Sequence, residues 1–375
     1  MLLDHLTKIR RDLHQIPELG FDLFKTHTYV WNYLSTLNFK LEVVAKTGII
    51  AYRQGVLKEA IAFRSDMDAL PVEEMTFVDY QSTHEQKMHA CGHDGHMTML
   101  LGFADYISSL ESINKSIVLI FQPAEEGPGG AKIIIESGIF EKYHITHIFG
   151  IHLYPNLDEG LFGLVNGPMM AQNSEFDLEI SGKSAHAAQP HMGIDAIFAA
   201  SELVQSYHHI ISRYVNPLKS GVLTVGTING GEARNIIAHQ VKLSGTIRSF
   251  HEETHHIIKQ KMIEINQSIE HHHHVKINCH INDYYPVVQN DEKLFDLLKN
   301  TLAPSAYRLI EPMMFAEDFA FYQKKVPGMF VMLGTKNEEK GFTHPLHSCY
   351  FNFDEKVLPF GIALYKHLFF HMKGI

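Results

Sequence analysis

Cysteine is scarce in this sequence of 375 residues, which contains only Cys91, Cys279 and Cys349. Three cysteines cannot build the disulfide framework on which small secreted domains rely. Long hydrophobic runs are also missing, because apolar stretches such as residues 116–121 fall far below the roughly 20 residues that a membrane span needs. The first residues, MLLDHLTKIRRDLH, are amphipathic and charged, without the apolar centre of a signal peptide. We therefore expect a cytoplasmic protein without a membrane partner.

Positive charge is in short supply as well. The sequence has 32 Lys and Arg residues against 42 Asp and Glu residues, a formal net charge of -10, and no long basic run. Binding to nucleic-acid phosphates needs concentrated positive charge, so we expect no nucleic-acid partner. The content of 45% hydrophobic and 20% charged residues is typical of a globular protein. The expected partner is a small-molecule substrate.

The length and the order of patterns predict two domains. Helical and strand patterns alternate in the first half, which is typical of an α/β domain with a mostly parallel sheet. From about residue 174 the order becomes strand, helix, strand, strand, helix, strand, as in a ferredoxin-like α+β unit. We predict a catalytic domain of residues 1–172 and 283–375, with an inserted lid or dimerisation domain of residues 173–282.

The individual elements follow from the same periodicities. The predicted helices cover residues 2–14, 27–38, 94–110, 130–137, 195–213, 252–270, 291–302, 316–325 and 354–371. The predicted strands cover residues 48–53, 60–65, 116–121, 145–152, 174–182, 221–228, 239–250, 275–281 and 328–334. The histidine run of residues 271–274 is expected to be a solvated loop, because a metal site needs convergent geometry and not only a high local density of histidine.

The segment HACGHDGH places Cys91 and His93 two residues apart, just before a predicted helix. This spacing can direct a thiolate and an imidazole at one metal cluster. By itself the spacing is a weak signal. A buried cysteine beside a histidine that caps the helix would give the same pattern.

Two adjacent carboxylates, Glu125 and Glu126, follow the apolar strand of residues 116–121. They stand at its C-terminal end, where α/β proteins build their active sites. The repulsion between two such carboxylates is offset if one binds a metal ion and the other meets a water molecule polarised by that ion. A solvated turn is the alternative, but it leaves the preceding apolar strand unexplained.

Further residues suited to metal coordination follow other predicted elements. Asp66 and Asp68 stand in RSDMDALP, His152 in FGIHLYP, and His344 and His347 in THPLHSCYF. Several separate strand ends that present such residues are hard to attribute to chance. The sequence therefore predicts a metal centre at the edge of the first domain's sheet.

Taken together, these motifs resemble the amidohydrolase branch of the co-catalytic metallopeptidases, which includes hippurate hydrolases, indoleacetyl-amino-acid hydrolases and N-acetyldiaminopimelate deacetylases. The resemblance covers nearly the whole chain. The matching segments are RRDLHQIPELGF, DMDALP, HACGHDGH, FQPAEEGPGGA, GIHLYP, GKSAHAAQPHMGIDA, NIIA, GTIR, AEDFAFY and HPLHS.

This resemblance implies two divalent metal ions, for which a set of cysteine, histidine and carboxylate ligands suits Zn, Mn, Co or Ni. It implies that Cys91 is the bridging thiolate and that the remaining ligands are His93, Glu126, His152 and His347. Glu125 is then the general base. Asp66 and Asp68 are the active-site acids that orient the histidine ligands.

For the inserted domain, the resemblance implies that His186 helps to hold the oxyanion, often in the active site of the other subunit of a homodimer. A structural loop histidine is the alternative reading of His186. Asn235, Arg234 and Arg248 match polar positions of the family and are expected to contact the substrate.

The motifs look closer to N-acetyldiaminopimelate deacetylases of lysine biosynthesis than to auxin-conjugate hydrolases. The expected reaction is hydrolysis of N-acetyl-LL-diaminopimelate to LL-diaminopimelate and acetate. The alternatives are hydrolysis of hippurate or another N-acyl amino acid, a dipeptidase of the same family, and a catalytically silent protein that keeps the fold.

Overall fold

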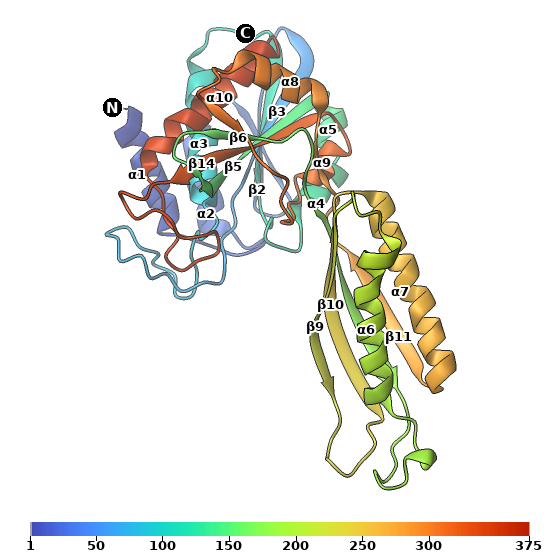
Figure 1. Ribbon diagram of the computed structural model, residues 1–375. Helices are drawn as coiled ribbons and strands as arrows, with labels where there is room; N and C mark the ends of the chain where they lie inside the picture. Colours follow the sequence, from blue (N-terminus) through green and yellow to red (C-terminus); the bar gives the residue numbers. More distant parts are fainter. Residues whose placement is uncertain (1, 375) are drawn as a thin grey trace. The chain divides into compact units, whose positions relative to one another are not determined.

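The computed structural model describes residues 2–374 and comprises two compact units, which Figure 1 colours by sequence. The first unit contains the residues up to Gly167, Gln289–Glu311 and the residues from Glu317 onward. The second unit contains Pro168–Val288 and Pro312–Ala316. Among the residues described, no helix has both the length and the apolar character needed to cross a bilayer.

An eight-stranded sheet with the order β1-β2-β4-β3-β5-β14-β6-β13 forms the centre of the first unit. Its strands are β1 (Lys40–Val44), β2 (Gly48–Arg53), β3 (Leu57–Asp66), β4 (Lys115–Gln122), β5 (Ile145–Asp158), β6 (Phe162–Leu164), β13 (Tyr307–Leu309) and β14 (Gly328–Lys336). The four adjacent strands β4, β3, β5 and β14 run parallel, whereas β1 and β2 are antiparallel. The predicted mostly parallel sheet is confirmed.

The helices of the first unit are α1 (Leu2–His14), α2 (Phe24–Ser35), α3 (His93–Ser109), α4 (Gly130–Glu136), α5 (Ile139–Lys142), α8 (Glu292–Thr301), α9 (Ala320–Gln323) and α10 (Leu358–His371). Helix α3 packs against α1, α10 and β3, and most of its residues are buried. The predicted helix of residues 316–325 is wrong in length, because only Ala320–Gln323 is helical. The side chains of Glu317 and Asp318 enter a buried ion pair instead.

The second unit is a four-stranded antiparallel sheet with two helices (Figure 1). Its elements are β8 (Gln172–Ser181), α6 (Ala196–Tyr214), β9 (Gly221–Gly230), β10 (Gln240–Ser249), α7 (Glu252–His273) and β11 (Lys276–Asp283). This is the predicted element order, and the strand order β11-β8-β10-β9 is that of a ferredoxin-like sheet. The short strands β7 (Gly167–Met170) and β12 (Val288–Asn290) and two 3₁₀ turns, Pro190–Met192 and Glu355–Val357, complete the element list.

The expectation of a solvated loop at residues 271–274 is wrong. Helix α7 continues through His273, and His274 is the C-cap residue with a left-handed backbone, at φ 55°. Close packing against α6 accounts for the extra turn, since Ile269 is buried in the core of this unit. Tertiary packing here outweighs the modest helix propensity of histidine.

Candidate metal centre

The residues predicted to bind metal converge within the first unit. Three groups have donor atoms that all lie within 4.8 Å of one another: Cys91 with His93 and His152, Cys91 with Glu126 and His347, and His93 with Glu125 and Glu126. Cys91 belongs to two of these groups. The five expected ligands and the expected general base therefore surround one small region, with the cysteine sulfur between two sets of donors.

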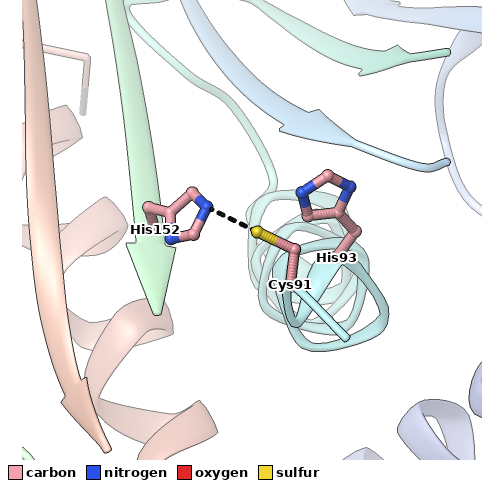
Figure 2. Close-up of side chains that lie close together, drawn as sticks. All are labelled: Cys91, His93 and His152. Atoms are coloured by element: carbon pink, nitrogen blue, oxygen red, sulfur yellow. Dashed lines mark hydrogen bonds between the residues drawn. The ribbon is translucent and has the colours of Figure 1, made fainter. Parts of the chain in front are cut away.

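Figure 2 shows how the start of α3 and strand β5 contribute to this region. Cys91 directly precedes the N-cap residue Gly92, and His93 is the first residue of α3. The left-handed backbone of Gly92, at φ 81°, is one that glycine adopts without strain. The thiol of Cys91 points toward His152 of β5, with 3.5 Å between Sγ and Nε2.

Both histidines present an imidazole lone pair to the cluster, because their other ring nitrogen is engaged. Nδ1 of His93 donates to the backbone oxygen of Asp68 at 2.8 Å, and Nδ1 of His152 donates to the backbone oxygen of Leu153 at 2.7 Å. Nε2 of His93 is buried and makes no hydrogen bond to any residue that the structure describes. A neutral imidazole held in this way is the form that binds a metal ion.

The paired glutamates are held by Asp68. Its two carboxylate oxygens accept hydrogen bonds from the backbone N–H groups of Glu125 and Glu126, each at 3.0 Å. Ala124, the residue before them, has a left-handed backbone at φ 59°. Since Asp68 also accepts from His93, it joins the turn after β4 to the start of α3.

His96 lies beside the predicted ligands but has no lone pair left for an ion. Its Nδ1 donates to Oδ1 of Asp66 at 2.7 Å, and its Nε2 accepts from the backbone N–H of Leu153 at 2.9 Å. Asp66 lies farther from His93, at 3.7 Å from Nδ1. The side chain of Asp66 therefore holds His96, whereas His93 is oriented by the backbone of Asp68.

Arg64 is a further residue of this site that was not predicted from the sequence, and it contacts Asp66. Its guanidinium is buried and reaches Asp66 at 2.8 Å, Asp318 at 2.9 Å and Glu317 at 3.0 Å. Asp318 also accepts from the side chain of Gln122 at the end of β4. The available signal was an arginine that directly follows the apolar run of residues 60–63 and stands two residues before Asp66, hence on the same face of the strand.

His347 approaches from the loop after β14. Its backbone N–H donates to the oxygen of Ala90 at 2.8 Å, and its φ is 65°. Nε2 lies 3.3 Å from Oε1 of Glu126, an oxygen that is buried and makes no hydrogen bond. The side chain of His347 is 52% exposed, so this side of the cluster is open to solvent.

The charges of the cluster suit a cation. Burial opposes protonation of His93, but Asp66, Asp68 and Glu126 outweigh burial and raise its pKa to about 10. Burial, followed by the nearby carboxylates, raises the pKa of the Cys91 thiol well above its usual value. In both shifts the contribution of the carboxylates reflects an excess of negative charge, which divalent ions would balance because they replace these protons. The thiol, imidazole and carboxylate donors therefore fit a metal centre.

The expected substrate residues of the second unit do not form one group. The loops of His186 and Asn235 lie side by side, because the N–H of Ala187 donates to the oxygen of Asn235 at 3.0 Å. Arg234 belongs to the same exposed loop before β10. Arg248 stands near the other end of β10, roughly 25 Å away at about 3.3 Å per residue. Its Nη1 is buried without a hydrogen-bond partner in the described part of the chain.

Comparison with known proteins gives consistent results. A model of peptidase family M20/M25/M40 matches residues 62–371. A protein of Staphylococcus aureus strain MRSA252, described as an uncharacterized hydrolase, is 36% identical over 380 residues, covering 100% of this chain and 99% of that one.

Two solved structures are similar over nearly the whole chain. A protein of methicillin-resistant Staphylococcus aureus has a TM-score of 0.91 and 31% identity, with 98% of this chain and 97% of that one covered. The Bacillus subtilis protein YXEP, described as a dinuclear metal binding peptidase from the M20 family, has a TM-score of 0.86 and 30% identity, with the same coverage.

Proposed function

Since this chain belongs to peptidase family M20/M25/M40 and is a hydrolase, we propose that it cleaves the amide bond of an N-acyl amino acid with the help of two divalent metal ions. The observation that carries the proposal is the position of Cys91, which is shared by two groups of potential ligands. The thiolate of Cys91 would then help to hold both ions, which accounts for that arrangement. The related Bacillus subtilis protein, described as dinuclear, supports the same stoichiometry.

We assign the ions to Cys91, His93, Glu126, His152 and His347, whose donor atoms converge. Bound there, the ions would polarise the scissile carbonyl and lower the pKa of the attacking water. Zn, Mn, Co and Ni all suit these ligands. The complete set of ligands, together with Glu125, supports a working enzyme over a catalytically silent protein of the same fold.

In this proposal Glu125 moves the proton. Burial, followed by the charges of Glu317 and Glu126, raises the pKa of Glu125 well above its usual value, and a raised pKa favours the uptake of a proton that a general base performs. As the water oxygen forms a bond to the acyl carbon, its proton passes to Glu125. Glu125 then returns a proton to the amine nitrogen when the carbon–nitrogen bond breaks.

We further propose that the second unit acts as a lid and mediates a homodimer. His186 and Asn235 lie at one end of its sheet and Arg248 at the other, about 25 Å apart by the rise of a strand. Residues so far apart cannot all contact one small substrate. We therefore assign Arg248 to the substrate of its own chain and the loop of His186, Arg234 and Asn235 to the partner's active site.

Mixing His186→Ala chains with Glu125→Gln chains tests this arrangement. Each variant alone should be inactive. A mixed dimer should regain activity, because one of its sites has an intact Glu125 and receives His186 from the other chain. If no mixture regains activity although subunit exchange is verified by mass spectrometry, His186 serves its own chain or has no catalytic role.

For the substrate we propose N-acetyl-LL-diaminopimelate, which would place the enzyme in lysine biosynthesis in the cytoplasm. The motif similarity to deacetylases supports this choice. So does Arg248, because burial lowers its pKa and its Nη1 is buried without a hydrogen-bond partner among the described residues, so that this nitrogen could bind the distant charged end of such a molecule. Burying the charged end of a substrate without a partner would cost several kcal/mol, so a site that supplies such a partner favours substrates with a charged end. An aromatic N-acyl substrate that lacks this end would gain nothing from Arg248 and would be discriminated against. Hippurate is the alternative if the acyl pocket is large and apolar.

The test compares kcat/KM for acetate release from N-acetyl-LL-diaminopimelate with kcat/KM for benzoate release from hippurate, with several added metals. Unblocked dipeptides complete the panel, and Glu125→Gln is the control that assigns activity to this site. A clear preference for hippurate or for dipeptides would overturn the substrate and leave the hydrolase assignment intact.

A further inference from the structure

A second cluster of potential metal ligands lies in the second unit, where helices α6 and α7 run side by side (Figure 1). Glu202 of α6 and His272 and His273 of α7 have donor atoms that all lie within 4.8 Å of one another. None of these residues takes part in the centre described above. We propose that this cluster is a separate binding site for a divalent transition-metal ion.

A regular helix does not by itself bring two adjacent histidine rings together. Consecutive helix residues point in different directions, so two adjacent histidines do not normally meet. At the end of α7, the rings of His272 and His273 lie edge to face with centroids 4.8 Å apart. Nε2 of His273 lies 2.7 Å from Oε2 of Glu202. The two imidazoles thus converge on the carboxylate of the neighbouring helix.

The cluster rests on a rigid support. Leu203 and Ile269, next to it on the two helices, are buried in the core of this unit. One turn farther along, the hydroxyl of Tyr207 donates to Asn266 at 2.6 Å between the same helices. The ring of Phe198 packs edge-on against His273 with centroids 5.1 Å apart, which restricts rotation of the imidazole. This contact reduces the conformational entropy that the His273 side chain would lose when an ion binds.

The donor set determines which ions fit. Two imidazoles and a carboxylate are typical of zinc sites with three protein ligands, in which water takes a further position. Imidazole also suits Cu, Ni and Co, whereas Mg and Ca prefer oxygen ligands. The side chain of Glu202 is 47% exposed and that of His273 is 8% exposed, so an ion can enter from solvent on the glutamate side. The partial negative charge at the C-terminus of α7 adds to the attraction.

An ion at this position would replace the hydrogen bond between Nε2 of His273 and Oε2 of Glu202. A bound ion would also fasten the last turn of α7 to α6. The expected consequence is a zinc-dependent stabilisation of the second unit that does not require the catalytic centre.

The test uses the full chain and zinc alone. Isothermal titration at neutral pH compares the wild type with His273→Ala, with Glu202→Gln, and with a matched control, His256→Ala, which removes an exposed histidine from the same helix. The wild type and His256→Ala should each bind one more zinc ion per chain than His273→Ala and Glu202→Gln. Because the catalytic ligands are intact in all four proteins, hydrolysis of a common N-acyl substrate should be unchanged.

Footprinting with diethyl pyrocarbonate locates the ion. Zinc should protect His272 and His273 from modification while His256 stays reactive. Glu202→Gln covers the case in which His273→Ala fails to fold, since glutamine keeps an acceptor for His273 and loses only the charge. Equal zinc stoichiometry in all four proteins, or modification of His272 and His273 that zinc does not change, would overturn the proposal.

Discussion

Replacement of Arg64 by methionine should expose how strongly the metal centre depends on the ion pairs beneath it. The Arg64 guanidinium is about 1% exposed and contacts the carboxylates of Asp66, Glu317 and Asp318 at 2.8–3.0 Å. Methionine fills a similar volume but leaves all three carboxylates buried without this cation. Breaking a buried ion pair from one side costs about 3–5 kcal/mol, and we expect at least this loss of unfolding free energy.

The loss of unfolding free energy in Arg64→Met should grow as the pH rises. Burial raises the pKa of Glu317 to about 8 and also raises the pKa of Asp318, while Arg64 lowers both. Without Arg64 these pKa values rise further, so the folded variant holds protons that the unfolded chain releases. The stabilisation from such groups is fully present below their unfolded pKa values of about 4. This stabilisation is lost as the pH rises toward the pKa values that these groups have in the folded state, so the unfolding free energy of the variant should fall between about pH 5 and pH 8.

The measurement is urea unfolding of metal-replete proteins at several pH values, followed by near-UV circular dichroism. Arg11→Met is the matched control, because Arg11 pairs with Glu355 with 44% of its side chain exposed and should lose only about 0–1 kcal/mol. Adding Asp318→Asn to Arg64→Met should recover part of the loss by removing one uncompensated charge. A loss equal to that of Arg11→Met, or one that does not change with pH, would refute the reasoning.

Three further predictions concern the metal centre itself. Glu125→Gln should keep its metal but lower kcat roughly 100- to 10,000-fold, whereas Glu126→Gln should lose metal. Elemental analysis of both variants, together with their kinetics, tests this assignment, and the reverse pattern would exchange the roles of the two glutamates. Cys91→Ala should weaken metal retention against chelators while Cys279→Ala should not, and equal retention would remove Cys91 from the ligand set. Asp68→Asn should keep the ligands but lower the unfolding free energy by about 1.5–3 kcal/mol, because one of the two backbone N–H groups loses its carboxylate acceptor; an unchanged urea midpoint would contradict this.

Local pattern was enough to predict most elements of the fold. Helix α1 and strand β2 have the predicted bounds, Leu2–His14 and Gly48–Arg53, because their periodicity and their boundaries are both encoded in neighbouring residues. Strand β5 is longer than predicted and continues to Asp158. Its second half has a partner in β14, and nothing in the local sequence reveals that pairing.

The ligand types were likewise visible in the sequence, because residues at the ends of neighbouring parallel strands must share one edge of the sheet. The sequence did not reveal which histidine keeps a lone pair free for a metal ion. The rings of His93 and His96 lie close together on α3, with centroids 5.3 Å apart. Only the hydrogen bond from the backbone of Leu153, 57 positions away in the chain, occupies the second nitrogen of His96.

Two further contacts also depended on tertiary structure, because they join residues that are far apart in the sequence. The pairing of Arg64 with Asp318 spans 254 positions, and the contact between Glu202 and His273 joins two helices across 71 positions. The sequence determined which side chains could bind protons or metals and the local element in which each one stands. Tertiary structure decided which of their donor atoms meet, because hydrogen bonds and burial between distant segments set the charge, the orientation and the free lone pairs of each group.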